Sequence, residues 1–282
     1  MNREMPDSAT MLAALEVAAR APSAGNAQPW RWVLGPSGVH LFAEVSDRRP
    51  YPALSARERV VSCGAALHHC VVALAELGWR VQVRRFPDQS DPDHIAALTL
   101  HRDPAVESEP ALTDAIPQRQ SDRRCYSDRV VAANLIAALS NRATQSGVVV
   151  RELTMTPRIR RVMAAHRDDA DHAVFLVLGT ANDRPSAWLR AGEATSMILL
   201  RATAHGLASC ALTEPLAVPE TREAIQRAVF GDLATPQVLI RVGWAPAHAD
   251  PLPPTRRRPV AEMVTRLDGP TKVGVHMPAA RR

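Results

Sequence analysis

Cysteines and aromatic residues are scarce in this sequence. Phe, Trp and Tyr make up 4% of its 282 residues, and there are only four cysteines, with no CxxC pair and no HExxH motif. Cys63 and Cys70 lie seven residues apart in a helical pattern, about two turns, and therefore cannot form a disulfide. We interpret the cysteines, and the neighbouring His68 and His69, as structural residues of a protein from a reducing compartment rather than as a metal site.

Long apolar runs are also missing. The first ten residues, MNREMPDSAT, are polar and contain no apolar core of a signal peptide. No apolar run approaches the length that is needed to cross a bilayer. The sequence therefore predicts a cytoplasmic protein without a membrane partner.

Several catalytic signatures are absent as well. There is no GxGxxG after a strand, no GxxxxGK[ST] and no GxSxG, and the carboxylates are spread singly along the chain. These absences argue against a Rossmann dinucleotide site, a phosphate loop and a hydrolase nucleophile. If the protein is an enzyme, a bound cofactor is expected to supply the chemistry.

The net charge of +5 and the pI near 9.5 indicate an anionic partner, either a phosphate-bearing cofactor or a nucleic acid. The nucleic-acid interpretation is the weaker of the two. Aromatic residues are few, the arginines alternate with acidic residues, and no RRM, helix-turn-helix or zinc-finger signature is present. We therefore expect no nucleic-acid partner.

Hydrophobic periodicity and turn residues predict an α+β fold. Helices are predicted at 11–20, 57–77, 127–143 (with Ser127 as N-cap), 156–166, 187–205 and 219–230, and strands at 31–35, 39–44, 79–85, 95–101, 147–153, 173–179 and 236–244. The stretch 103–118 is polar and interrupted by prolines, so we predict no element there.

Two of these helices have the same pattern. GAALHHCVVALAELG (64–78) and GEATSMILLRATAHG (192–206) each begin and end with glycine and are apolar on nearly every face. Helices of this kind are buried on all sides. We predict that they lie side by side at the centre of the molecule and that the chain is an internal duplication with a period of about 128 residues. The alternative is a coincidence between two alanine-rich helices.

The loop PSAGNAQPW (22–30) is unusual because it places small residues and two carboxamides directly before the first strand. Pro22, Ser23 and Ala24 leave room for a flat ligand near the backbone, and the amides of Asn26 and Gln28 offer a donor and an acceptor to a ring edge. The alternative is an ordinary loop with Asx-turns.

Two basic segments could bind a phosphate group. Arg119, Ser121 and Arg123 have R-x-S-x-R spacing, so their side chains share one face of an extended segment and could converge on one phosphate. The second segment, TRRRPVAE, contains Arg256–Arg258 and follows the last predicted strand. Each segment could instead be a solvated charged linker.

Taken together, the three segments resemble the flavin-dependent nitroreductase family. The loop matches the P-S-S/A-x-N-x-Q-P-W signature, Arg119–Arg123 matches the family's R-x-S-x-R, and Arg257 and Arg258 correspond to its C-terminal basic pair. ALTEPL lies where the family places a backbone N–H against the flavin, which adds Thr213 and Glu214 as candidates. The resemblance implies FMN as cofactor and a nitroreductase-like α+β fold. In that fold, two pseudo-symmetric halves each have a mostly antiparallel sheet around long buried central helices.

The order of the motifs differs from that of the family, in which R-x-S-x-R comes first and the partner subunit supplies the P-S-x-x-N loop. Here the loop precedes both basic segments. This order resembles the Acg-type subfamily and implies a fused dimer with halves at 1–110 and 111–282. We expect a monomer that acts as a pseudo-dimer and binds one FMN, with weak homodimerisation left open.

The resemblance implies two functions. The first is hydride transfer from NAD(P)H through FMN to a nitroaromatic, a quinone or a similar small acceptor. The second is sequestration of FMN under a lid with little turnover, for which 245–255 and the tail 272–282 are the candidate lid segments.

Overall fold

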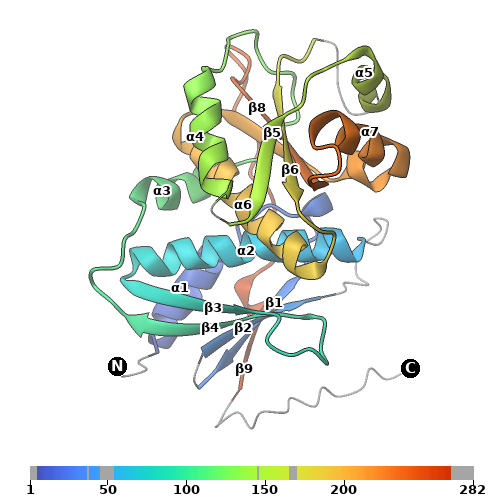
Figure 1. Cartoon of the computed structure of the whole chain (residues 1–282). Helices are drawn as coiled ribbons and strands as arrows, with labels where there is room; N and C mark the ends of the chain where they lie inside the picture. Colours follow the sequence, from blue (N-terminus) through green and yellow to red (C-terminus); the bar gives the residue numbers. More distant parts are fainter. Residues whose placement is uncertain (1–4, 37, 45–53, 145, 165–169, 268–282) are drawn as a thin grey trace.

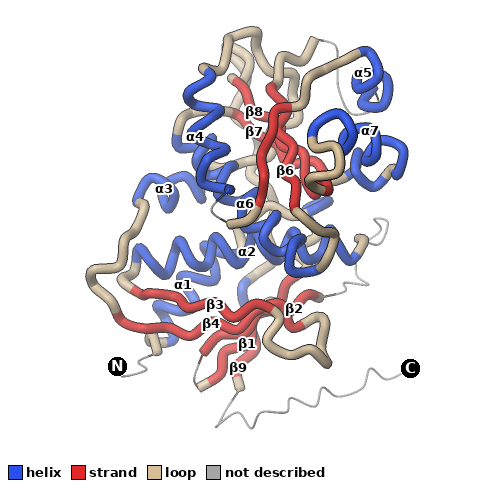
Figure 2. Tube along the Cα trace, viewed as in Figure 1, coloured by secondary structure: helices blue, strands red, loops and turns tan. Residues whose placement is uncertain are grey.

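The computed structural model describes residues 5–36, 38–44, 54–144, 146–164 and 170–267. In these ranges the chain forms two sheets at opposite ends of the molecule, with two long helices between them (Figure 1). Helices and strands alternate along the trace in both parts (Figure 2). The α+β class predicted from the sequence is confirmed.

The helices and strands divide between a first and a second part of the chain. The first part contains α1 (Ser8–Ala18), β1 (Trp30–Gly35), β2 (Gly38–Ala43), α2 (Ala56–Glu76), β3 (Trp79–Arg85), β4 (His94–Arg102) and α3 (Pro110–Gln118). The second contains α4 (Ala133–Thr144), β5 (Val148–Glu152), α5 (Pro157–Met163), β6 (Val174–Thr180), α6 (Pro185–Ala204), β7 (Ala208–Leu212), α7 (Pro219–Val229), β8 (Thr235–Gly243) and β9 (Val264–Arg266). Short 3-10 turns lie at Ala24–Asn26, Glu214–Ala217 and Val260–Glu262.

The two sheets share one strand order. The first reads β3-β4-β2-β1 and the second β7-β8-β6-β5, with every neighbouring pair antiparallel. Each order arises from a helix, two strands, a long central helix and two further strands, and in the second part α5 and α7 are inserted between the strands of each pair. The repeated topology supports the duplication, whereas the division at residues 110 and 111 stays a prediction. The short β9 adds to the first sheet parallel to β1, so the end of the chain returns to the first part.

Local signals explain where the central helices begin and end. Ser55 and Glu58 form a reciprocal capping box at the start of α2, and Pro185 occupies the first turn of α6. Gly78 and Gly206 follow the two helices with φ of +76° and +74°, a conformation that glycine adopts without strain.

The central helices cross at their two opening glycines. A Cβ on Gly64 would lie 2.2 Å from the carbonyl oxygen of Leu189, and one on Gly192 would lie 2.0 Å from that of Val61. Both glycines are therefore required for the close approach of α2 and α6. The two contacts are related by the same shift of 128 residues, so the crossing lies on the pseudo-symmetry axis.

The sheets differ in how they are covered. α2 and α1 pack on one face of the first sheet, and Trp30 and Trp32 are buried in that core. The second sheet has a buried cluster on each face, one with α4 and α6 and one with α5 and α7. This double cover explains why β6 and β8 are buried along nearly their whole length.

Three expectations need correction. Ser127 is not an N-cap, because α4 begins only at Ala133 and the backbone N–H of Ser127 donates to the Trp244 carbonyl. Arg129 stacks on the Trp244 ring at 3.7 Å, and these contacts hold 127–132 outside the helix. The stretch 103–118, predicted to have no element, contains α3, which starts with Pro110 in its first turn. Strand β9 was not predicted from the pattern.

Among the described residues, no helix has both the length and the apolar character that a membrane crossing requires.

Candidate functional site

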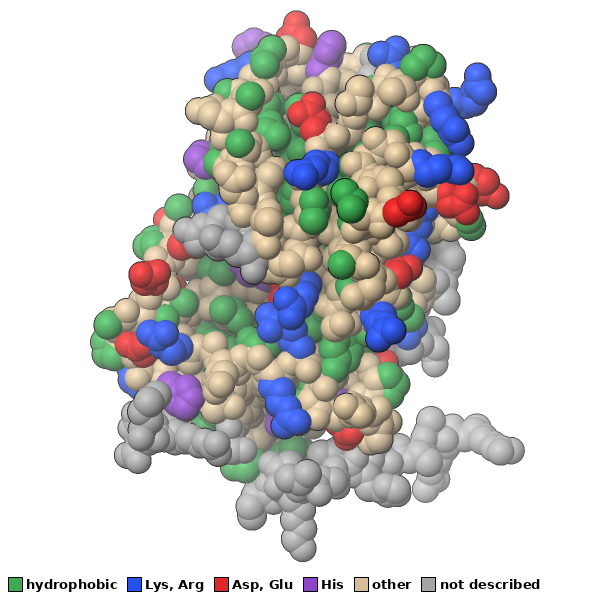
Figure 3. Space-filling model, viewed as in Figure 1, with side chains coloured by type: hydrophobic (Ala, Val, Ile, Leu, Met, Phe, Trp, Pro, Cys, Tyr) green, Lys and Arg blue, Asp and Glu red, His purple; other side chains and the backbone are tan. Residues whose placement is uncertain are grey.

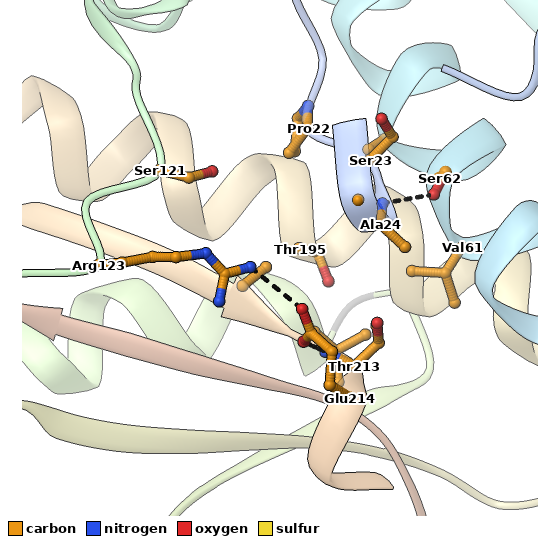
Figure 4. Close-up of a pocket in the computed structure, with 14 residues that line it drawn as sticks. Pro22, Ser23, Ala24, Val61, Ser62, Ser121, Arg123, Thr195, Thr213 and Glu214 are labelled. Carbon is orange, nitrogen blue, oxygen red and sulfur yellow. Dashed lines mark hydrogen bonds and ion pairs between the residues drawn. The ribbon is translucent and has the colours of Figure 1, made fainter. Parts of the chain in front are cut away.

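A pocket lies between the loop at 22–25, the segment that follows α3, the two central helices and the second sheet (Figure 4). It contains about 510 Å³ of space between protein atoms, part of it open to solvent. Its walls are small or polar on most sides. The lining residues are Pro22, Ser23, Ala24, Gly25, Val61, Ser62, Ala65, Ser121, Arg123, Thr195, Ala211, Thr213, Glu214 and Val238.

The loop is fixed to α2 beside the pocket. The backbone N–H of Ala24 donates to the Ser62 hydroxyl (3.2 Å), which in turn donates to the Glu58 carbonyl (2.7 Å). The Ser23 hydroxyl accepts from the backbone N–H of Gln28 at 3.0 Å. Gly25 has φ +55° and no atom within 4 Å of where a Cβ would lie, so the loop turns there with open space beside it. Of the predicted loop residues, Pro22, Ser23 and Ala24 line the pocket.

The two carboxamides do not line the pocket and instead bind the C-terminal arginine segment. The Asn26 amide donates to the Arg256 carbonyl at 3.0 Å, and its oxygen accepts from Arg257 Nη1 at 3.2 Å. Gln28 is buried, and its Oε1 accepts from the backbone N–H of Arg258 at 2.8 Å. Asn26 and Gln28 therefore join the first part of the chain to its far end.

Arg119 and Arg257 lie together behind the loop. Both donate to the carbonyl oxygen of Arg20, at 3.4 Å and 3.1 Å. Arg119 is 4% exposed, and burial together with the charges of Arg257 and Arg20 lowers its pKa to about 10. Two guanidinium groups are thus held close together, that of Arg119 buried and that of Arg257 half-buried.

Several buried donors at this place have no partner in the described part of the chain. They include Nε and Nη1 of Arg119 and Nε of Arg257. Buried polar groups are nearly always hydrogen-bonded, and an unpaired buried cation is costly. An anion bound between the two guanidinium groups would satisfy these donors.

The arginines of the R-x-S-x-R segment do not converge as alternation predicts. Arg123 points into the pocket and pairs with Glu214 at 3.1 Å (Figure 4). Arg119 instead lies buried and shares the Arg20 carbonyl with Arg257. Ser121 lines the pocket.

The predicted backbone donor at ALTEPL is occupied in this structure. The Thr213 N–H donates to the Glu214 carboxylate at 2.9 Å, and the Thr213 hydroxyl donates to Glu58 at 3.0 Å. Thr213 and Glu214 nevertheless both line the pocket.

Arg258 stabilises the loop rather than the pocket. Its guanidinium donates to the Gln28 carbonyl at 3.1 Å and pairs with Glu44 at 2.9 Å. The predicted arginine pair thus divides, with Arg257 beside Arg119 and Arg258 bound to the loop.

The pocket residues on the long helices were missed by sequence reasoning. Val61, Ser62, Ala65 and Thr195 lie within predicted helices, where nothing distinguishes them from core residues. Comparing the two repeats position by position would have shown that each is smaller than its counterpart, which is Leu189, Arg190, Glu193 and Leu67 in turn. Within the described residues, no group of three or more His, Cys, Asp or Glu side chains could hold a metal ion.

The chain is similar to curated mycobacterial proteins over nearly its whole length. "Putative NAD(P)H nitroreductase Rv3131" of Mycobacterium tuberculosis (strain ATCC 25618 / H37Rv) is 38% identical over 94% of this chain and 93% of its own. "Putative NAD(P)H nitroreductase acg" of the same strain is 32% identical over 89% and 93%. No family model matches the chain.

Among solved structures, a nitroreductase with bound FMN from Bacteroides fragilis NCTC 9343 is 16% identical and covers 60% of this chain and 98% of its own, with a TM-score of 0.42. An NADH dehydrogenase/NAD(P)H nitroreductase structure from Parabacteroides distasonis ATCC 8503 is 20% identical, with coverages of 53% and 95% and a TM-score of 0.42.

The identity and coverage of the curated relatives show that the chain belongs to the NAD(P)H nitroreductase family. Within it, the relative named acg assigns the chain to the Acg type, and the resemblance read from its motifs is confirmed.

Proposed function

We propose that this protein binds one FMN per chain and transfers hydride from NADH or NADPH to a small acceptor such as a nitroaromatic or a quinone. One observation supports it most: the buried Arg119, which has unpaired donors, and the half-buried Arg257 lie together at the Arg20 carbonyl, two residues before the pocket residue Pro22. The curated relatives are named NAD(P)H nitroreductases, which supports NADH or NADPH as the reductant.

The residues present fit FMN. A phosphate group would accept from the free donors of Arg119 and Arg257, for which the described chain provides no acceptor. Pro22, Ser23 and Ala24 leave space for a flat ring, and Ser121 offers a hydroxyl between the two ends.

When bound, FMN supplies the hydride chemistry. The chain's own residues would bind FMN and orient it. Arg119 and Arg257 neutralise an anionic tail, and the loop at 22–25 forms one wall of the ring space. Glu214 pairs with Arg123 at the pocket, and this guanidinium would supply a positive charge beside a bound flavin.

Sequestration is the second candidate. The proline-rich segment 245–255 is fixed along the R-x-S-x-R segment, where Gln120 donates to the Pro253 carbonyl at 3.1 Å and Arg124 donates to the Asp250 carbonyl at 2.7 Å. A segment held in this way could restrict access to bound FMN. The other proposed lid, 272–282, lies outside the described residues.

Anaerobic addition of NADPH to FMN-loaded protein separates the two candidates. Hydride transfer predicts loss of the oxidised flavin absorbance within the mixing experiment, followed by recovery when a quinone is added. Absorbance that persists with both NADPH and NADH would contradict the reductase and favour sequestration.

Nucleic-acid binding gains no support from the face shown in Figure 3. Its basic side chains are separated by acidic, apolar and other surface instead of forming one continuous patch. The expectation of no nucleic-acid partner stays a prediction, which salt-dependent retention of duplex DNA would overturn.

A further inference from the structure

Three segments of the pocket wall lead from the pocket to the same buried region. On α2, His69 follows the pocket residue Ala65 by four positions and so lies on the same helix face. On β7, Ser209 precedes Ala211 by two positions and points to the same side of the sheet. In the segment after α3, Arg119 precedes the pocket residue Ser121 by two positions.

Side-chain atoms without a hydrogen-bond partner lie on these segments, and the charges of Arg119 and Arg257 act on His69. His69 is fully buried, and its Nε2 has no hydrogen-bond partner in the described chain; the same holds for the Ser209 hydroxyl. With the free donors of Arg119 and Arg257, these atoms form what we term the polar cluster: His69, Arg119, Ser209 and Arg257. Three buried polar side chains and the half-buried Arg257, all with buried atoms that lack a hydrogen-bond partner, point to a ligand rather than to a structural role.

The neighbours of His69 fix where its proton lies. Nδ1 is 3.1 Å from the Ala65 carbonyl oxygen, which can only accept, and 2.8 Å from the Ser196 hydroxyl. Nδ1 therefore carries the hydrogen, and in the neutral ring Nε2 is a bare acceptor. A bare acceptor cannot bind an anion.

Burial and the charges that face His69 keep it neutral without a ligand. Burial, followed by Arg119, His68 and Arg257, lowers its pKa well below 6.5 against the opposing effect of the Ala65 carbonyl. Around the cluster, Arg20 acts on both arginines, and the Cys210 thiol acts on Arg119. No carboxylate acts on His69 among these groups, so only an incoming anion would reverse the balance.

We propose that His69 is a further ligand of the cofactor's anionic end and takes up a proton at Nε2 when that anion binds. This inference rests on the proposed FMN site. The proton comes from the buffer, the ring becomes a cation, and Nε2–H donates to a phosphate oxygen, while Nδ1–H keeps its contact with Ala65. The complex then holds one more proton than its separated parts, so affinity falls as pH rises.

Isothermal titration of FMN in buffers of different ionisation enthalpy measures this proton directly. Wild-type protein should take up more protons per FMN than His69→Asn, by up to about one, between about pH 6 and pH 8. Over the same range its FMN affinity should fall more steeply, by up to about tenfold per pH unit relative to the variant. Asn keeps a donor near the Nδ1 position but cannot ionise, and titration of the FMN phosphate is common to both proteins.

His68→Asn is the matched control, because His68 also contacts Ser196, at 2.8 Å, but belongs outside the cluster. It should take up as many protons as the wild type. If His69→Asn does not fold, the ring nitrogen shifts of wild-type His69 should change from the neutral to the cationic form on addition of FMN. FMN that binds with equal uptake in both proteins, or with no shift of the ring nitrogens, overturns the role of His69 alone. No FMN binding by the wild type overturns the proposed function as well.

Discussion

The pocket and its pseudo-symmetric counterpart differ in whether side chains fill them. A shift of 128 residues takes the pocket residues Ala65 and Thr213 to Glu193 and Arg85. At the counterpart these two side chains form a bidentate ion pair, in which the Arg85 guanidinium donates through Nε and Nη2 to both Glu193 oxygens at 2.9–3.2 Å. Glu193 is largely buried, and this burial raises its pKa against the effect of Arg85. The volume that is empty in the pocket is filled at the counterpart by the side chains of Arg85 and Glu193.

The polar cluster shows the same difference. The counterparts of His69 and Ser209 are Met197 and Val81, both of which pack against apolar clusters. His69 and Ser209 have side-chain atoms without a hydrogen-bond partner, whereas Met197 and Val81 have no side-chain nitrogen or oxygen atom. We infer that duplication of a symmetric site left one copy free to bind a cofactor, while the other was filled and now stabilises the fold.

The largest effect should come from filling the pocket. Ala65→Leu places a large side chain where the ring space begins and should lower FMN affinity by more than about 100-fold, about 2.7 kcal/mol. Quenching of flavin fluorescence measures it. Glu193→Leu puts the same residue at the counterpart and should change affinity by less than about threefold. Equal losses in the two variants would show that the two sites are not functionally distinct, and circular dichroism checks that both have folded.

The next largest effect should come from Arg119, the buried cation with two unpaired donor atoms. Arg119→Met should weaken FMN binding by about 100-fold yet make the FMN-free protein more stable, by about 1–2 kcal/mol, because a buried charge with unmet donors is removed. Arg85→Met at the counterpart leaves Glu193 unpaired and should destabilise the protein instead. Urea unfolding of the FMN-free proteins measures the change in the free energy of unfolding for both variants. Destabilisation by Arg119→Met would indicate a structural arginine.

A smaller effect is expected where the two halves are equivalent. Gly64→Ala and Gly192→Ala each place a methyl group against a backbone carbonyl of the other helix, and each should lower the free energy of unfolding by about 1–3 kcal/mol. The two losses should be similar, in contrast to the asymmetric pocket variants. A loss in only one variant would argue against the shared axis.

Much of the fold could be predicted from the sequence because the signals are local. Periodicity gave both central helices, and the repeated glycines, Gly64 with Gly78 and Gly192 with Gly206, indicated the pairing that the structure shows. The start of α4 could not be predicted, because the contacts of Trp244 that hold 127–132 outside the helix come from a distant strand end.

The candidate site was only partly predictable. The resemblance to the nitroreductase family placed the loop and Arg257 in one site, and in the structure a hydrogen bond joins Asn26 to Arg257, 231 positions away. It could not show that Asn26 and Gln28 bind the C-terminal arginine segment instead of lining the pocket, or that Arg123 pairs with Glu214. These partners depend on burial and on tertiary distance, which spacing does not encode.

A crystal structure of the protein with FMN tests the central claim most directly. The account predicts one FMN per chain, with its phosphate within hydrogen-bond distance of Arg119 and Arg257 and its ring against Ser23 and Ala24. FMN bound beside Arg85 and Glu193, or a phosphate that touches neither Arg119 nor Arg257, would contradict it.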